Sequence, residues 1–344
     1  MGSLKTPQGK IVDSFLFSEV FEKELLLLKF ILESPYVEEW ILLENAYSFQ
    51  GEYKGLHAKN LLDSDDRFAP YRNRITIIAK EIQPEVLNKE LVQDEKAFKV
   101  EFWQRDLAHD YFINKYSDDD WIIISDVDEA LDFTDETRCN ELFERIENEE
   151  HGVLHVCTKR YWFDFDNEYK ILYGIPMCTK KHLLENGKKL HDVRFEYHAD
   201  LKMEWNNIIG FEYSSCFDSG NIFRKLETGS HMGFSEENLK KALFCNHRVI
   251  SEKRKRTLKP TDKFMLDTIT LNERNSPKYV RDYLLKLKTN NIDPNYLENR
   301  MKAYPKLYSR FYELNEYIDE KKKYFQKKFR YLIRRLHLEK LIYE

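Results

Sequence analysis

Two aspartates and a glutamate follow directly on a short apolar run in the middle of the chain. Residues 121–125 read WIIIS, and Asp126, Val127, Asp128 and Glu129 come next. Residues two apart in an extended backbone point to the same face, so Asp126 and Asp128 are predicted to lie side by side. Two carboxylates that close repel each other unless a positive charge lies between them, and such oxygen ligands suit Mn²⁺ or Mg²⁺. We therefore expect a divalent metal site here, although the pair could also simply end a strand and cap the following turn.

The segments around this acidic run alternate between strand and helix patterns. Apolar or alternating stretches predict strands at residues 10–17, 37–46, 74–82, 121–125 and 152–165, and helical patterns cover residues 18–33, 89–116 and 134–149. Ser18 and Thr134 are the expected N-caps of the first and last of these helices. Such alternation is typical of a mostly parallel sheet with helices on both faces, which binds ligands at the carboxyl ends of its strands. The predicted fold class is therefore α/β.

Length and composition limit the domain organisation and the partners. The chain has 344 residues, of which 55 are Lys or Arg and 60 are Asp or Glu, so its formal net charge is −5. That balance argues against a protein that binds nucleic acid through overall charge. After residue 206 helical patterns rich in Lys, Tyr and Leu dominate. We expect a catalytic domain over residues 1–250 and a helical C-terminal region over 251–344.

Cysteines and apolar runs bear on the location of the protein. The five cysteines are scattered without a CxxC pair, which argues against a disulfide scaffold or a zinc site and favours a reducing compartment. No run approaches the roughly 18 apolar residues of a membrane-spanning helix. Residues 321–344 are basic and place Phe325, Phe329, Leu332 and Leu336 at helical spacing, which suits an anionic membrane surface or packing on the catalytic domain. We expect a cytoplasmic protein, with peripheral membrane contact through 321–344 as an open alternative.

The stretch from Ser125 to Glu129 resembles the metal-binding motif of glycosyltransferase family 17. Further blocks that are similar to this family, in matching order, are residues 11–15, residues 40–45 with Gly51 after them, and residues 102–105, 210–217 and 225–231. The resemblance implies a GT-A-like fold, a nucleotide-sugar donor such as UDP-GlcNAc, a divalent metal and inversion at the anomeric carbon. The chain departs from the family at Gly210-Phe211-Glu212, where the family usually reads Gly-Trp-His.

Transfer of a sugar to a hydroxyl group needs a general base, which is usually a carboxylate. Glu212 occupies the variable His position of the family and is the favoured candidate. Asp218 just beyond it and Glu129 beside the metal motif are the other catalytic candidates. Each of the three could equally be an ordinary surface carboxylate, so the sequence leaves the identity of the base open.

Other residues are candidates for binding the donor or the metal. The donor-binding candidates are Asp13, Glu44, Arg105 and Asp126, and the metal-ligand candidates are Asp126, Asp128 and His231. Glu44 at a strand end could instead be an N-cap or loop carboxylate. Arg105 could pair structurally with an aspartate, and His231 could be a structural hydrogen-bonding residue.

Together with the acidic run, the resemblance to this family implies a metal-dependent inverting glycosyltransferase. Its expected partners are a UDP-sugar donor and a glycan or glycoconjugate acceptor, with no nucleic acid. A haloacid-dehalogenase-like phosphohydrolase is an alternative, because that class also places Asp-x-Asp after an apolar strand. That motif normally opens its domain, however, whereas three predicted strands precede the motif and its own strand here. A non-enzymatic module that binds a structural cation is the other alternative.

Overall fold

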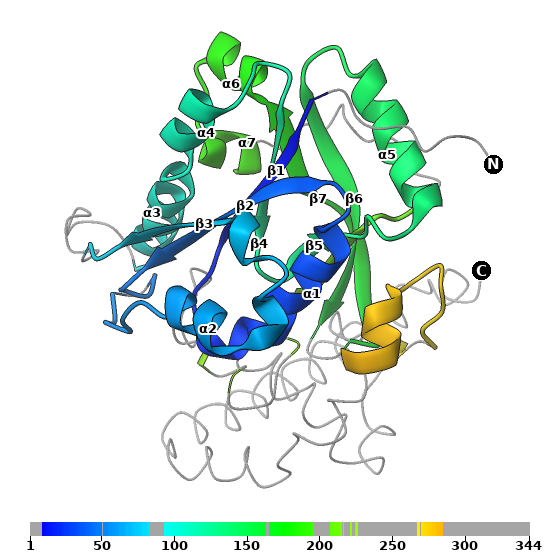
Figure 1. Ribbon diagram of the computed structural model, residues 1–344, viewed down its shortest axis with the longest axis horizontal. Coiled ribbons are helices and arrows are strands. Elements are labelled where there is room, and N and C mark those ends of the chain that lie inside the picture. Colours follow the sequence, from blue (N-terminus) through cyan, green and yellow to red (C-terminus); the bar gives the residue numbers. More distant parts are fainter. Residues whose placement is uncertain are drawn as a thin grey trace, which may run out of the picture. The chain divides into compact units, whose positions relative to one another are not determined.

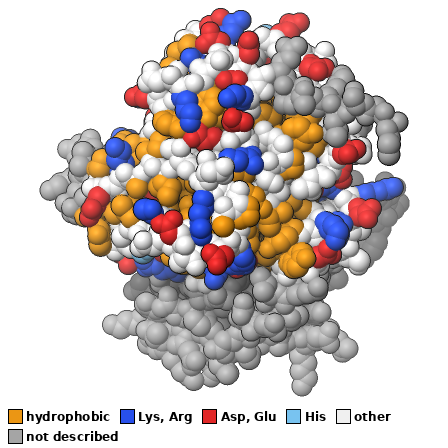
Figure 2. Space-filling view, in the orientation of Figure 1, with side chains coloured by type: hydrophobic (Ala, Val, Ile, Leu, Met, Phe, Trp, Pro, Cys, Tyr) orange, Lys and Arg blue, Asp and Glu red, His pale blue; other side chains and the backbone are white. Residues whose placement is uncertain are grey.

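The computed structural model describes residues 9–49, 51–82, 93–162, 165–195, 207–214, 216, 221, 224–225, 267–268 and 270–284 (Figure 1). The predicted features that lie outside these residues are Asp218, His231, the domain boundary at residue 250 and the basic segment 321–344. No helix in the described part of the chain is long and apolar enough to cross a membrane. Acidic and basic side chains are mixed over the face shown in Figure 2, as the near balance of charge leads one to expect.

One sheet organises the described residues. Its strands are β1 (Ile11–Leu16), β2 (Val37–Asn45), β3 (Ile75–Lys80), β4 (Trp121–Asp126), β5 (Glu129–Leu131), β6 (Val153–Trp162), β7 (Asn167–Thr179), β8 (Gly210–Ser214) and β9 (Asp267–Thr268). Their order is β3-β2-β1-β4-β7-β6-β8-β5, with β9 paired to β7. The α-helices are α1 (Lys23–Glu33), α2 (Ala58–Ser64), α3 (Gln93–Asp106), α4 (His109–Lys115), α5 (Glu136–Asn148), α6 (Lys180–Asn186) and α7 (Leu190–Phe195). Short 3₁₀ turns are η1 (Val20–Glu22), η2 (Asp66–Phe68) and η3 (Arg72–Arg74), and η6 (Val280–Leu284) is a π-helix.

The strands and helices confirm the α/β class, and the strand directions show that the parallel part of the described sheet consists of four neighbouring strands. β3, β2, β1 and β4 all run parallel. Beyond β4 the sheet is mixed, because β7 runs antiparallel to β4 and β6, and β8 runs parallel to β6 but antiparallel to β5. Only residues 163–166 connect β6 to β7, too few for the crossover that a parallel pair needs. The expectation of helices after residue 206 is wrong for Gly210–Ser214, which forms β8.

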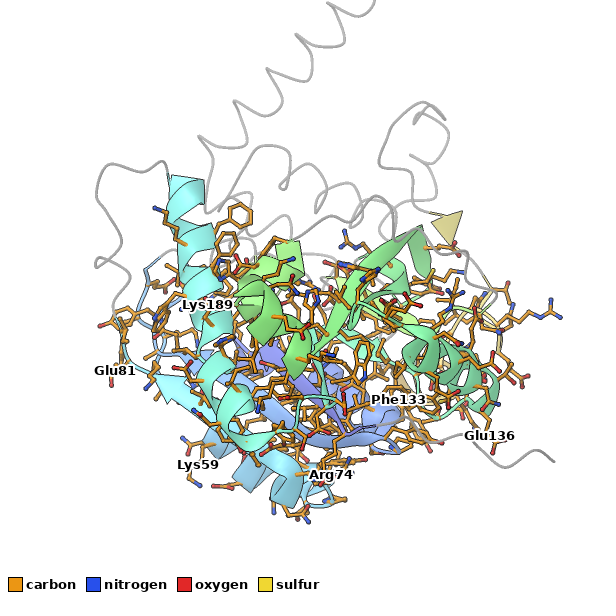
Figure 3. All side chains as sticks on the ribbon, turned by 90° about the horizontal axis from the view of Figure 1, so that it is seen from above. Lys59, Arg74, Glu81, Phe133, Glu136 and Lys189 are labelled. Carbon is orange, nitrogen blue, oxygen red and sulfur yellow. The ribbon has the colours of Figure 1, made fainter. Side chains whose placement is uncertain are left out.

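Helices cover both faces of the parallel strands (Figures 1 and 3). On one face Phe15 of β1 belongs to an apolar cluster with Phe30 of α1 and Phe143 of α5. On the other face Val12 of β1 belongs to a second cluster with Phe112 of α4. Apolar side chains therefore fill both faces, and the polar groups that could meet a ligand collect at the carboxyl edge of the strands.

Two helix starts differ from the prediction. The segment after β1 begins as the turn η1, where the Glu22 carboxylate accepts hydrogen bonds from the backbone amides of Ser18 and Glu19, so Ser18 is not the N-cap of α1. The N-cap of α5 is Asp135, one residue after the predicted Thr134, and its side chain accepts from two backbone amides of the first turn. At α5 a carboxylate therefore satisfies the free amides of the first turn that the Thr134 hydroxyl was expected to satisfy.

Candidate functional site

The acidic run forms the tight turn between β4 and β5. Asp126 ends β4, and its backbone amide donates to Oε2 of Glu129, the first residue of β5, at 3.0 Å. Because β1, β2 and β3 run parallel to β4, their carboxyl ends reach the same edge of the sheet. The sequence predicted this position for the acidic run correctly.

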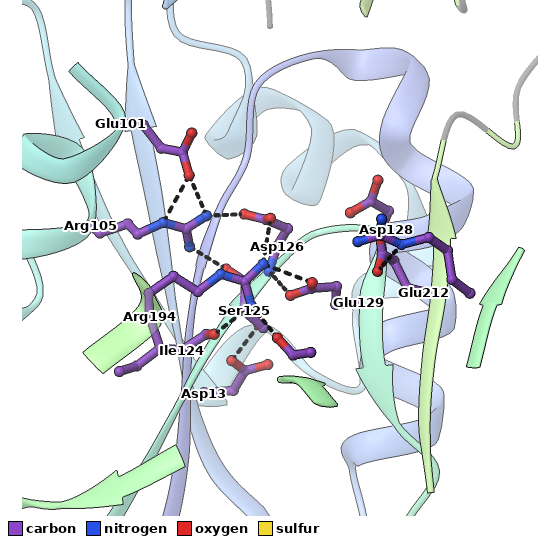
Figure 4. Close-up of polar contacts among 12 residues, drawn as sticks. Asp13, Glu101, Arg105, Ile124, Ser125, Asp126, Asp128, Glu129, Arg194 and Glu212 are labelled. Carbon is purple, nitrogen blue, oxygen red and sulfur yellow. Dashed lines mark hydrogen bonds and ion pairs between the residues drawn. The ribbon is translucent and has the colours of Figure 1, made fainter. Parts of the chain in front are cut away.

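Asp126 lies between two arginines, one from α3 and one from α7 (Figure 4). Nη2 of Arg105 lies 2.6 Å from Oδ1 of Asp126, and Nη2 of Arg194 lies 3.0 Å from Oδ2. Burial acts to raise the pKa of Asp126, but the two arginines outweigh it and hold that pKa well below its usual range. Asp126 is therefore a permanent anion whose two oxygens are both engaged.

Arg105 is held rigidly in this position. Its guanidinium contacts Oε1 of Glu101 one turn earlier in α3 at 2.8 Å, and Nη1 donates to the carbonyl of Ser125 at 2.9 Å. The side chain is buried. In this structure Arg105 therefore pairs with an aspartate, as one of the two sequence interpretations held, and direct contact with a donor stays a prediction.

Arg194 is a site residue that sequence reasoning missed. It lies in the short helix α7, and its Nη2 bridges Asp126 and Oε1 of Glu129, the latter at 2.7 Å. Its Nη1 donates to the carbonyls of Ile124 and Gly174, on β4 and β7. The nearest signal in the sequence is indirect: clustered carboxylates need cations, but nothing local shows which basic residue supplies them.

Asp128, the second aspartate of the run, meets a lysine rather than an arginine. Nζ of Lys225 lies 2.6 Å from Oδ2 of Asp128 and 3.6 Å from Oε1 of Glu22. Asp128 is 8% exposed, and its Oδ1 has no hydrogen-bond partner among the described residues. Lys225 was not predicted as a site residue, although it opens one of the blocks in which the sequence resembles a known family.

Glu212 lies directly opposite Glu129, because β5 and β8 pair in that register. Its Oε2 accepts from Nε of Arg160 at 2.6 Å, and the side chain is 5% exposed. Burial raises the pKa of Glu212 to about 8; Arg160 opposes the shift, and the charges of Glu129 and Asp128 add to it. The structure therefore brings together Glu212, Glu129 and Asp128, which lie far apart in the sequence (Figure 4).

The strand that carries Glu212 has a fixed position against β6. Gly210 begins β8 opposite Thr158, and a Cβ added to Gly210 would lie 2.5 Å from Oγ1 of Thr158 and 2.9 Å from the carbonyl oxygen of Cys157. Both separations are too short for any side chain, so glycine is required where the two backbones approach.

Asp13 and Glu44 lie behind the edge of the sheet. Oδ1 of Asp13 accepts from the hydroxyl of Ser125 at 2.7 Å, and Oδ2 lies 2.5 Å from Nζ of Lys29. The two oxygens of Glu44 accept the backbone amides of His57 and Ala58, at 2.6 and 3.1 Å. Both carboxylates are buried and engaged within the protein. Glu44 of β2 thus caps the amides at the start of α2, in line with its interpretation as a capping carboxylate, and donor contact by Asp13 or Glu44 stays a prediction.

Lys29 of α1 ties the acidic turn to the core. Its buried ammonium donates to the Ser125 hydroxyl at 2.9 Å and to the carbonyl of Glu129 at 2.6 Å, and it pairs with Asp13 and Glu33. Burial, followed by the charge of Asp13, raises the pKa of Glu33 well above its ordinary value. A single lysine therefore fixes the residues on both sides of the Asp126–Asp128 turn.

The side chains at this edge of the sheet differ in how well they fit a divalent cation. No group of three or more His, Cys, Asp or Glu side chains among the residues the structure describes could hold a metal by itself. Both oxygens of Asp126 face arginines, whereas Oδ1 of Asp128 has no hydrogen-bond partner in the described part. Mg²⁺-type sites that act on phosphates commonly use one or two carboxylates, with phosphate oxygens and water completing the shell. Asp128 therefore fits a cation that binds together with a diphosphate.

Comparison with known proteins adds one match. The sequence matches the family described as glycosyltransferase family 17 over residues 2–173, which is half of the 344 residues. The matched range includes Arg105 and the acidic turn, and it ends before Arg194, Glu212 and Lys225. The search of curated proteins gave no match.

Proposed function

The chain belongs to glycosyltransferase family 17, and from that membership we propose that it transfers a GlcNAc-like sugar from a UDP-sugar to a glycan hydroxyl, with a divalent cation and inversion at the anomeric carbon. As a glycosyltransferase it uses a sugar donor and a glycan acceptor. The observation that carries the finer proposal is the proximity of Asp128 to Glu212, close enough that the charge of Asp128 helps to raise the pKa of Glu212 (Figure 4). Asp128 offers a carboxylate oxygen for a cation, and Glu212 offers a carboxyl group whose pKa is about 8.

The first requirement of the reaction is positive charge near the leaving group. The UDP diphosphate gains negative charge as its bond to the sugar breaks. A divalent cation on Asp128 would supply Lewis-acid stabilisation of that charge. Arg105 and Arg194 keep Asp126 ionised and fixed beside this position, so the charges of the site are arranged before the donor arrives.

The second requirement is a base for the acceptor hydroxyl, which loses its proton as it attacks the anomeric carbon. Glu212 suits this role best, because its Oε1 has no hydrogen-bond partner among the described residues while Oε2 is held by Arg160. Both oxygens of Glu129 are engaged, by Arg194 and by the amide of Asp126. A raised pKa also makes ionised Glu212 a stronger base than an ordinary glutamate. Oε1 of Glu212 is then the atom that takes the proton.

Family membership favours a glycosyltransferase over the two alternatives that the sequence left open. A phosphohydrolase of the haloacid-dehalogenase type would use the first aspartate of the run as its nucleophile. Both oxygens of Asp126 are in ion pairs with arginines, which lowers the nucleophilicity of that carboxylate. A purely structural cation module would have no use for a buried carboxyl group with a raised pKa such as that of Glu212.

The proposal is tested by binding and turnover with UDP-sugars. A ligand at about 100 times its Kd adds about 2.7 kcal/mol to the folded state, so UDP-GlcNAc with Mn²⁺ should raise the melting temperature by several degrees. Asp128→Asn should remove the Mn²⁺-dependent part of this shift and the turnover of the donor. Asp118→Asn is the matched control, because Asp118 precedes the same strand at its opposite end and is exposed. If no UDP-sugar raises the melting temperature or is consumed, the proposed donor class is wrong.

A further inference from the structure

Two adjacent basic residues, Arg224 and Lys225, contact three different loops at the carboxyl edge of the sheet. Arg224 lies 2.8 Å from Glu52 in the loop after β2 and 3.4 Å from Glu19 in the loop after β1. Lys225 lies 2.6 Å from Asp128 in the turn after β4. The pair thus places two positive charges where the loops that follow the parallel strands meet.

The ammonium of Lys225 lies where a divalent cation would bind. It contacts Oδ2 of Asp128, and Oε1 of the buried Glu22 lies 3.6 Å away. Burial alone would lower the pKa of Lys225, but Asp128 and then Glu22 raise it above its usual range, so the ammonium stays charged. Like charges repel each other, so the ammonium on Oδ2 weakens the binding of a divalent cation to the same carboxylate for as long as it stays in place.

Lys225 differs from the two arginines of the site in the kind of side chain and in its exposure. Arg105 donates to the carbonyl of Ser125, and Arg194 donates to that of Ile124, so β4 fixes both guanidinium groups. The ammonium of Lys225 contacts side-chain carboxylates, its side chain is 28% exposed, and its stem rotates about four carbon–carbon bonds. A lysine of this kind can move a point charge over several ångströms while the backbone stays where it is.

We propose that Lys225 occupies the cation position on Asp128 in the free protein, and that its ammonium moves to the diphosphate of the donor when the divalent cation binds. This inference rests on the proposed function, because it needs a donor with a diphosphate. The exchange keeps the turn neutralised before the donor arrives. It also adds a positive charge to the leaving group afterwards, when the phosphate oxygens provide new partners for the ammonium. Lys225 is in this view both a competitor of the cation and a ligand of the donor.

The exchange predicts opposite changes in two affinities. Calorimetry with Mn²⁺ alone should show about tenfold tighter binding to Lys225→Met than to the natural protein, the factor that corresponds to 1.4 kcal/mol of competition. With saturating Mn²⁺, the same variant should bind UDP about tenfold more weakly. Arg224→Met removes the same charge one residue earlier without touching Asp128, so its Mn²⁺ affinity should stay unchanged.

A labelling experiment on the natural protein tests the exchange without depending on whether a variant folds. Acetylation followed by mass spectrometry should show low reactivity of Lys225 in the free protein, higher reactivity with Mn²⁺, and protection when UDP is added to Mn²⁺. The exposed Lys59, which pairs with Asp63 on α2, should react equally in all three conditions.

The outcomes separate this inference from the proposed function. Unchanged or weaker Mn²⁺ binding by Lys225→Met, or a Lys225 reactivity that ignores Mn²⁺, would overturn the exchange even if UDP binds. Failure of the natural protein to bind UDP would instead refute the proposed donor, whereas a rise of Lys225 reactivity with Mn²⁺ would still support the displacement step.

Discussion

Replacing Glu212 by glutamine changes two quantities whose sizes follow from the structure. The folded-state pKa of Glu212 is about 8, against an ordinary value of 4.5, so the folded protein keeps a proton that the unfolded chain has lost. The stabilisation from this group is fully present below the unfolded value and is lost as pH rises through the folded value. Each pH unit in between costs about 1.4 kcal/mol, so the natural protein should lose up to about 4 kcal/mol between about pH 5 and about pH 8. Glu212→Gln, which cannot ionise, should not show this loss.

The assay is denaturant unfolding of the natural protein and Glu212→Gln at both pH values, together with turnover. The difference in unfolding free energy between the two proteins should grow in favour of the variant as pH rises, because only the natural protein has the Glu212 carboxyl group to ionise. Turnover should fall by about 100-fold or more, the scale of a lost general base, while UDP binding changes little. Glu144→Gln, an exposed position on α5, is the control and should change neither quantity.

Two results would refute this reasoning in different ways. Equal pH dependence in both proteins would mean that Glu212 is not the buried, proton-holding group described here. Normal turnover together with the predicted pH dependence would mean that Glu212 is buried as described but that another group is the base.

Three further predictions concern Asp128 in the acidic turn, Lys29 beneath that turn, and the C-terminal residues 321–344. Asp128→Asn should abolish sugar transfer, measured with a UDP-sugar and Mn²⁺, while the protein stays folded, since it removes one of several crowded carboxylates; a variant with near-normal turnover would contradict a cation role. Lys29→Met should lower the free energy of unfolding by about 3 to 5 kcal/mol in denaturant titrations, because it leaves Asp13 buried without its cation; a loss below about 1 kcal/mol would show that the cluster matters little. From the basic pattern of 321–344, the full chain should sediment with anionic vesicles at low salt and be released at high salt. Removal of 321–344 should abolish sedimentation and keep donor hydrolysis; unfolding of the shortened chain would instead show that the segment packs on the catalytic domain.

The part of the site that the sequence predicted depends on local order. Asp126 and Asp128 share a strand end, and an apolar run before them is enough to place both at a sheet edge. The cations that neutralise them come from elsewhere: Arg194 lies 68 residues and Lys225 97 residues away along the chain. No local pattern marks such partners, because only the packing of α7 and of residues 224–225 brings them to the turn.

The part of the fold that the sequence missed depends on strand pairing. β7 carries charged residues near its start, so its sequence shows a weaker strand pattern than the buried parallel strands. β8 has only 5 residues. The juxtaposition of Glu129 and Glu212 follows from the register of β5 with β8, which single-sequence patterns do not specify. The role of Glu44 was ambiguous for a different reason, since a carboxylate at a strand end can accept backbone amides as readily as a ligand hydroxyl.

The close approach of Gly210 to Thr158 bears on how this site can diversify. No side chain fits at Gly210, so the distance between the backbones of β8 and β6 is fixed there. The residue two positions later, Glu212, can change without altering that distance. Glycosyltransferase family 17 usually has histidine at the position of Glu212, whereas this chain has glutamate. Two proton acceptors of different charge can therefore occupy the same backbone position. On the proposed role of Glu212 as the base, natural variation at this position alters the pH range and the acceptor preference without rebuilding the sheet. A substitution at Gly210 would displace whichever acceptor is present, and selection should tolerate exchange at the one position far more readily than at the other.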